Sequence, residues 1–181
     1  IRDRYDRLLR LTDPLVRAGL PVLQTAVTNA HLPCIALLAR LYNDEVMCVA
    51  DCSAPMTPFR SSYERGKPMP LTKGATSKVI LAALPARQLG RLVGPREESA
   101  SLRDELIAVR RAGYCFAAGE IDSGLAAVAA PIVHTEQGIV ASLTLVVDAS
   151  NLDEARQDRI TMLTISAAGL IGEAMTRDVL A

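Results

Sequence analysis

Several features that define common protein classes are missing from this 181-residue chain. It has no tryptophan, two phenylalanines and two histidines, and Lys plus Arg balance Asp plus Glu at 20 each. A domain that bound nucleic acid through its own surface would usually carry a basic surplus. No apolar run reaches the roughly 18 residues that span a membrane, and the opening IRDRYDRLLR has no signal-peptide pattern. With half of its residues hydrophobic and 22% charged, the chain is predicted to be a soluble globular protein without membrane contacts.

The cysteines do not form a metal-binding pattern. There is no C-x-x-C pair, and ligand spacing typical of zinc is lacking. The candidate metal ligands are Cys34, Cys48, Cys52, Cys115, His31 and His134. We therefore predict no metal and no cofactor, and reduced, buried thiols in a cytoplasmic protein.

Catalytic patterns are weak. The segment 70-PLTKGATSKVILAALP-85 contains a glycine, two hydroxyls and a lysine, but it lacks the second glycine of a phosphate-binding loop. No histidine lies near Thr76 or Ser77 in the sequence. Glu120 and Asp122 form a carboxylate pair that could do acid–base chemistry, although a solvated loop is the simpler interpretation. We predict no catalytic residues and no enzyme activity.

Hydrophobic periodicity and turn residues predict an α+β fold. Strands are expected at 34–42, 46–52, 58–64, 114–118, 125–134 and 139–147. Helices are expected at 13–29 with a break or a kink at Gly19 and Pro21, at 73–84, at 85–94, after a capping box at Ser101, and after a cap at Ser150-Asn151. Short turns between consecutive strands favour an antiparallel sheet of about six strands, flanked by helices. Pro131 indicates a sheet edge or a bulge.

Small residues gather on one side of the predicted sheet. Ala127 and Ala129 share one face of their strand, and Ser142, Thr144 and Val146 share one face of the next. Small side chains leave volume that a packed interior normally fills, so either a helix packs unusually close or a cavity lies there. The helix start at 72–76 offers unpaired N–H groups that attract an anion. A pocket for a small organic acid, or for a neutral ring with one oxygen, is one consequence.

Two blocks of the sequence resemble a known family. PLTKGATSKVILAALP is similar to the P-L-x-x-x-A-x-G-K-x-x-L-A-x-L-P block of the IclR family of bacterial transcriptional regulators. Residues 105–147 resemble that family's L-x-x-I-R-x-x-G-Y…GE…G…AAP(I/V)…G-x-V-x-A-x-L-x-(V/G) pattern. The matching landmarks appear in the same order over residues 68–148, and their order makes the resemblance specific.

The resemblance implies a carboxyl-terminal effector-binding domain with a GAF/profilin-like fold. Residues 1–11 would be the tail of a linker helix and residues 12–181 the effector domain. A winged helix-turn-helix domain that binds operator DNA would lie outside this chain. The resemblance also implies a homo-oligomer, a dimer or a tetramer, and a small-molecule effector such as a carboxylic acid or an aromatic compound. Two alternatives stay open: a GAF-type sensor domain of another signalling protein, and a small-molecule enzyme.

The effector contacts follow from the resemblance, position by position. The expected contacts are Ala75, Thr76, Ala117, Ala127, Thr144 and Val146, and Ala129 and Ser142 join them because they share the same strand faces. The chain departs from the family pattern at three positions. Ser77 replaces the usual glycine before Lys78, Ala117 stands where some relatives carry aspartate, and Ala127 stands where some carry cysteine. These departures predict a larger or more hydrophobic effector than a two- or three-carbon keto acid. Lys78 is expected to pair with an acid or to point outward, and Cys115 to lie on the opposite face.

Overall fold

The core of the molecule is one six-stranded antiparallel sheet, seen in a computed structural model that describes residues 12–180. The strands are β1 (Cys34–Tyr42), β2 (Glu45–Ser53), β3 (Pro68–Met69), β4 (Cys115–Ala118), β5 (Leu125–His134) and β6 (Ile139–Asp148), in the order β3-β2-β1-β6-β5-β4. The helices are α2 (Pro14–Asn29), α3 (Ala75–Ala83), α4 (Ala86–Val93), α5 (Arg96–Ala112) and α6 (Glu154–Val179). Two 3₁₀ turns, η1 (Thr135–Gln137) and η2 (Ala149–Asn151), flank β6. The predicted α+β class and antiparallel sheet are confirmed.

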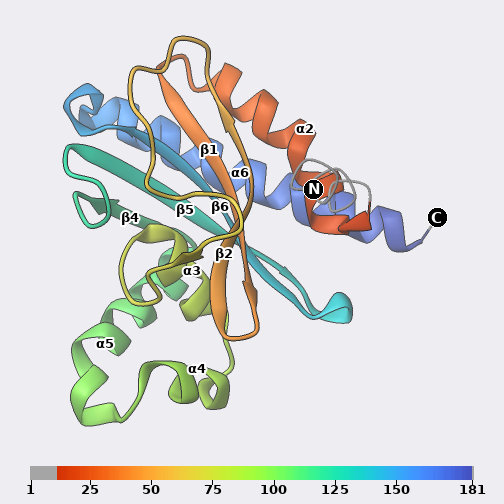
Figure 1. Cartoon of the computed structure of the whole chain (residues 1–181), viewed down its shortest axis with the longest axis vertical. Helices are drawn as coiled ribbons and strands as arrows, with labels where there is room; N and C mark the ends of the chain where they lie inside the picture. The colour runs from red at the N-terminus through yellow and green to blue at the C-terminus, as the bar shows by residue number, and fades with distance from the viewer. Residues whose placement is uncertain (1–11, 181) are drawn as a thin grey trace.

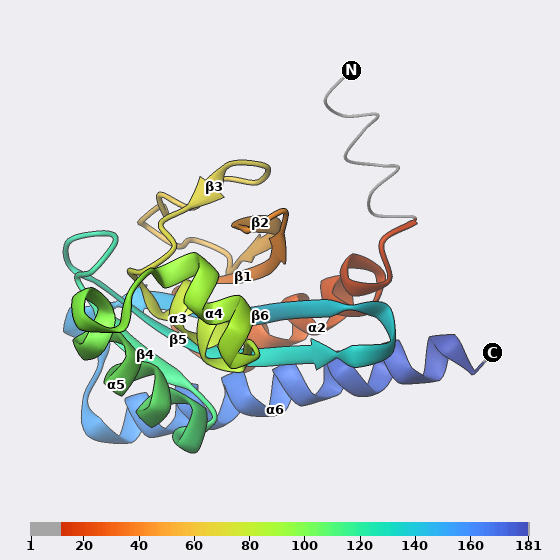
Figure 2. The ribbon, with the colours of Figure 1, turned by 90° about the horizontal axis from the view of Figure 1, so that it is seen from below.

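Helices cover both faces of the sheet (Figures 1 and 2). α2 and α6 pack on one face and α3 packs on the other, with α5 beside it. The alternation of side chains along β5 divides its residues between these layers: Ala126 and Val128 join the α2–α6 side, and Ala129 joins the α3 side. On β6, every residue from Ala141 to Val147 is buried, because helices lie against both of its faces.

α2 is continuous, so the predicted break at Gly19 or Pro21 is wrong. Pro21 lies on the exposed side of the helix, where water can reach the carbonyl that has lost its N–H partner. Gly19 serves close packing instead: a Cβ there would lie 2.6 Å from Leu38 Cδ2 on β1. The predicted start of this helix is confirmed, since Asp13 accepts a 2.9 Å hydrogen bond from the Leu15 amide.

Three other predicted boundaries are wrong. Residues 58–64 form no strand; the third strand is Pro68–Met69, which pairs with Met47 and Val46 on β2. α5 begins after Pro95, with two glutamates in its first turn that complement the helix dipole, so the expected capping box at Ser101 lies inside the helix. α6 is capped by Asp153, which accepts a 2.8 Å bond from the Arg156 amide, while Ser150-Asn151 belongs to η2.

Two further expectations concern Pro131 and residues 1–11. β4 pairs with residues 126–129 of β5 only, so Pro131 lies where β5 has a strand on one side alone, and the predicted edge position is confirmed. The expected linker-helix tail at residues 1–11 lies outside the described residues.

Candidate functional site

The first turn of α3 is held by the protein's own side chains. Gly74 caps the helix with φ of 83°, and Thr76, Ser77 and Lys78 are all buried although they are polar. Ser77 Oγ donates a 2.5 Å hydrogen bond to the carbonyl of Pro70, which ties the helix to the segment before it. A glycine at position 77, usual in the related family, could not make this bond.

Lys78 and Glu120 form an ion-pair network that anchors the loop between β4 and β5, residues 119–124. Lys78 Nζ donates to Glu105 Oε1 at 2.6 Å and to Glu120 Oε1 at 2.7 Å, and its side chain is 6% exposed. Glu120 Oε2 also accepts a 2.7 Å bond from the amide of Gly74. The expectation that Lys78 pairs with an acid is confirmed.

Both partners in this network remain charged at neutral pH. Burial alone would raise the pKa of Glu120, but the hydrogen bonds from Lys78 and from Gly74 outweigh it and lower that pKa. Burial alone would lower the pKa of Lys78, but hydrogen bonds to Glu105 and Glu120 outweigh it and raise that pKa. The carboxylate of Glu120 therefore occupies the anion-attracting end of α3.

A second set of bonds holds the other end of the 119–124 loop. Asp122 Oδ2 accepts a 2.9 Å bond from the amide of Ser62, and Asp122 Oδ1 accepts from the Ser62 hydroxyl. Residues 61–63 thus lie against the loop rather than against β2, which explains why the expected strand at 58–64 does not form.

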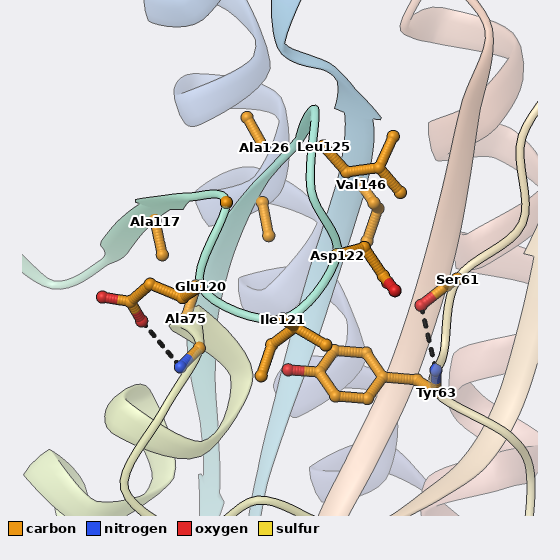
Figure 3. A pocket seen from close by; sticks show the side chains of 13 residues that line it. Ser61, Tyr63, Ala75, Ala117, Glu120, Ile121, Asp122, Leu125, Ala126 and Val146 are labelled. Atoms are coloured by element: carbon orange, nitrogen blue, oxygen red, sulfur yellow. Dashed lines mark hydrogen bonds between the residues drawn. The ribbon is translucent and has the colours of Figure 1, made fainter.

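A small hollow lies between the start of α3, the 119–124 loop and the sheet (Figure 3). Four of the eight predicted effector residues line it: Ala75, Ala117, Ala127 and Val146. Its volume is about 20 Å³, room for about one water molecule. Larger side chains, chiefly Tyr63, Ile121 and Leu125, fill the space that the alanines leave.

The other four predicted residues lie deeper, outside the lining of the hollow. Thr76 and Thr144 are fully buried and share a hydrogen bond of 2.7 Å between their hydroxyl oxygens. Ala129 and Ser142 are also fully buried, and Ser142 Oγ has no hydrogen-bond partner within the described part of the chain. These residues support the floor rather than form its surface.

Sequence reasoning missed Tyr63 and Ile121, which we call the partition. Both side chains lie against the cap of α3: a Cβ at Gly74 would be 2.5 Å from Tyr63 Oη and 2.8 Å from Ile121 Cγ1. The Tyr63 hydroxyl is buried, its pKa is raised by that burial, and no hydrogen bond to it forms within residues 12–180. The Thr76 side chain lies near enough to lower this pKa in part, and its own hydroxyl shares a hydrogen bond with Thr144. No local sequence pattern points to Tyr63, because the position of its side chain depends on the path of an irregular segment.

Beyond the partition lies a wider cavity, the outer groove. Its volume is about 390 Å³, and Tyr63, Glu120 and Ile121 line both it and the hollow. Its far wall comprises Lys67, Pro68, Met69, Pro70 and Lys73. The partition and Glu120 thus lie at the boundary between the hollow and a cavity of ligand size.

Groups suited to catalysis or metal binding are inactive or dispersed. Burial raises the pKa of Cys34 and of Cys115 to about 11 and that of Cys48 to about 12, so these thiols stay protonated. Cys115 shares the α3 side of β4 with Ala117, so its predicted placement on the opposite face is wrong. In the described residues, His, Cys, Asp and Glu form no group of three that could hold a metal ion. No helix between residues 12 and 180 is long and apolar enough to cross a membrane.

The structure is an α+β domain with a hollow between the start of a helix and one face of an antiparallel sheet. The model of the bacterial transcriptional regulator IclR C-terminal family matches residues 21–172. The chain therefore belongs to this family and is the effector-binding domain of a transcriptional regulator.

Solved structures agree with this fold. The C-terminal domain of a transcriptional regulator from Vibrio cholerae is similar with a TM-score of 0.78 and 23% identity, covering 90% of this chain and 99% of that one. IclR of Thermotoga maritima has a TM-score of 0.81 and 17% identity, covering 95% of this chain and 72% of that one. An IclR homologue from Microbacterium hydrocarbonoxydans, solved in complex with 4-hydroxybenzoate, has a TM-score of 0.77 and 22% identity, covering 94% of this chain and 74% of that one. No curated protein sequence matches the chain.

Proposed function

We propose that this domain binds a small organic effector at the hollow, and that binding changes the DNA affinity of the regulator to which the domain belongs. The observation that carries this proposal is the hollow itself. It lies between the capped start of α3 and the alanines of β4 and β5, where a packed interior would have larger side chains. The 4-hydroxybenzoate complex of the Microbacterium relative supports a small organic molecule as the type of ligand.

Binding requires the partition to move. A space of about 20 Å³ holds about one water molecule, so the hollow is closed to any organic ligand in this conformation. Displacement of Tyr63 and Ile121 would join the hollow to the outer groove. An effector that binds only this open arrangement shifts the population toward it, in proportion to its difference in affinity for the two states. The hydrogen bonds of Glu120 and Asp122 stabilise the closed state. The binding free energy of the effector must exceed the stability that these bonds provide.

The remaining features of the proposal follow from the family. Operator DNA would be bound by a winged helix-turn-helix domain outside this chain, the regulator would be a dimer or a tetramer, and it would act in the cytoplasm. A non-enzymatic role is supported by the polar groups near the hollow, since Lys78 is held in ion pairs with Glu105 and Glu120 and the nearby thiol of Cys115 stays protonated. The family match favours a transcriptional regulator over a sensor domain from another signalling protein.

Filling the hollow tests the proposal. Ala117 and Ala118 are neighbours on β4, but Ala117 lines the hollow and Ala118 is exposed. A library of small aromatic and aliphatic metabolites is screened by thermal shift on the parent chain. A ligand at 100 times its Kd stabilises by about 2.7 kcal/mol, or roughly 5–10 °C for a domain of this size.

Ala117→Leu is expected to abolish the shift given by each active compound, and the matched Ala118→Leu variant to retain it. Ala127→Val, a milder filling of the same space, serves as a second test should Ala117→Leu unfold. Equal shifts in all three variants would place the ligand elsewhere and refute the proposal.

A further inference from the structure

The charges around the hollow are predominantly negative. Two carboxylates, Glu120 and Asp122, belong to residues that line it, and none of the lining residues is Lys, Arg or His. The nearest buried cation is Lys78, which is shared between Glu120 and Glu105. Lys78 therefore faces two carboxylates, while the third, Asp122, accepts hydrogen bonds from Ser62 instead. Glu64, Lys67 and Lys73 line the outer groove across the partition, and counting them as well leaves four carboxylates against three ammonium groups.

A carboxylate of the protein itself already lies at the start of α3. Free amides at a helix start attract a carboxylate, and the Gly74 amide donates to Glu120 Oε2 at 2.7 Å. An incoming carboxylate would meet Glu120 within a few ångströms, in a site with little water to screen the repulsion. The lining of the hollow thus has no basic side chain to balance an anionic ligand, and Glu120 competes with such a ligand for the helix start.

What the partition does offer is an unpaired hydroxyl. Tyr63 Oη is buried, lines the hollow and has no hydrogen-bond partner within the described range. A buried hydroxyl without a partner is unfavourable and rare in native proteins. A ligand oxygen placed beside it would satisfy it, and a neutral oxygen would do so without adding charge near Glu120 and Asp122.

We propose that the effector site selects neutral, oxygen-bearing molecules, such as aryl aldehydes, ketones or phenols, over carboxylates, with Tyr63 as the specificity-determining donor. This inference rests on the proposed function of the hollow and narrows its ligand class. Carbonyl and phenolic oxygens accept a hydrogen bond from the Tyr63 hydroxyl, and an aromatic or aliphatic body contacts the alanines and Val146. The 119–124 loop rejects anions through Glu120 and Asp122.

Selectivity for charge can be measured before any effector is identified. Ala127→Cys places a thiol at the hollow, and Thr28→Cys places a reference thiol on the exposed side of α2. Each variant is alkylated with iodoacetamide, which is neutral, and with iodoacetate, which is anionic and of nearly the same size. The parent chain measures the background from its native cysteines. Because both reagents need the same access, their rate ratio reports the local charge rather than the opening of the hollow.

The neutral-to-anionic rate ratio is expected to be roughly tenfold higher for Ala127→Cys than for Thr28→Cys. Adding Glu120→Gln, which keeps an acceptor for the Gly74 amide, should bring the two ratios closer together. Glu136→Gln, which removes an exposed charge within η1, should leave them unchanged. Equal ratios at the two thiols would overturn the inference and leave the proposed function intact. Failure of both reagents at Ala127→Cys would instead count against the proposed function, since the hollow would admit nothing.

A matched ligand pair tests the role of Tyr63. Calorimetry compares benzaldehyde with benzoate, which share the same ring and differ in carrying a neutral aldehyde or a carboxylate. The aldehyde is expected to bind at least tenfold more tightly, and Tyr63→Phe to weaken its binding by roughly three- to tenfold through loss of one hydrogen bond. Tighter binding of the carboxylate, or unchanged aldehyde binding in Tyr63→Phe, would contradict the proposal.

Discussion

Replacing Lys78 with methionine tests whether the buried ion-pair network stabilises the start of α3. Methionine keeps most of the apolar stem of lysine and removes the ammonium group. Glu105 and Glu120 would then face each other without a cation, and Glu120 would keep only the bond from the Gly74 amide. The change therefore isolates charge and hydrogen bonding from packing.

The expected loss of stability lies between the values for buried and for exposed ion pairs. Removing one partner of a fully buried pair costs about 3–5 kcal/mol. Here the Glu105 and Glu120 side chains are 47% and 34% exposed, so water can solvate them, and we expect a loss of about 2 kcal/mol. For a domain of this size that is a fall in Tm of roughly 4–8 °C.

Urea unfolding followed by circular dichroism measures this loss. Arg91→Met is the matched control, because it breaks the pair with Asp44, both of whose side chains are more than half exposed; its effect should stay within about 0.5 kcal/mol. Adding Glu105→Gln and Glu120→Gln to Lys78→Met should restore most of the stability, since no unpaired charge remains. A Lys78→Met variant as stable as the control would refute this reasoning.

The loss should also depend on pH in a defined direction. Glu120 has a folded-state pKa below its ordinary 4.5, so its stabilising effect is complete above pH 4.5 and is lost as the pH falls through the lowered value. Lys78 has a folded-state pKa above 10.5, so its effect is complete below pH 10.5 and is lost as the pH rises further. Parent and Lys78→Met stabilities should therefore differ most between these limits and converge in acid.

Three further predictions concern single positions. Gly74→Ala should destabilise the fold by about 2 kcal/mol or more, because φ is 83° and the new Cβ would lie 2.5 Å from the Tyr63 hydroxyl. An unchanged stability in chemical unfolding would contradict this and show that the partition side chains move aside at little cost. Thr144→Val should cost about 1–2 kcal/mol by leaving the Thr76 hydroxyl unpaired, while the double variant with Thr76→Val should recover most of it; additive losses would contradict this coupling. Asp153→Ala should cost about 1 kcal/mol by removing the cap of α6, with Asp153→Asn near the parent value in the same assay.

The long, periodic elements of this fold could be predicted from the sequence. β5 and β6 were expected within a residue of their observed bounds, because alternation and the turn at 135–138 define them locally. Predicted element boundaries were wrong where a contact distant in the sequence determines the boundary. The segment 58–64 is polar and strand-like in composition, but Ser62 bonds to Asp122, 60 residues away, and the backbone follows that bond.

The residues of the candidate site also divide into those that local patterns place and those that distant contacts place. Ala127 and Val146 could be placed on one face by alternation and by the family resemblance, and both line the hollow. Tyr63 and Ile121 come from irregular segments, so no period or turn motif points to them. The bond from the Gly74 amide at the start of α3 to Glu120 also depends on a tertiary contact, so the sequence alone could not show that this amide is engaged.

The sheet ends in two very short strands, and this limits how copies of the chain can associate. β3 has 2 residues and β4 has 4, while β5 beyond β4 carries Pro131, which has no N–H to donate. Edges this short, and one interrupted by an imino acid, make poor templates for a neighbouring strand. Pairing of a second copy of the chain with β3, with β4 or with the Pro131 end of β5 is therefore disfavoured, and with it the cross-molecule sheets that such pairing would begin.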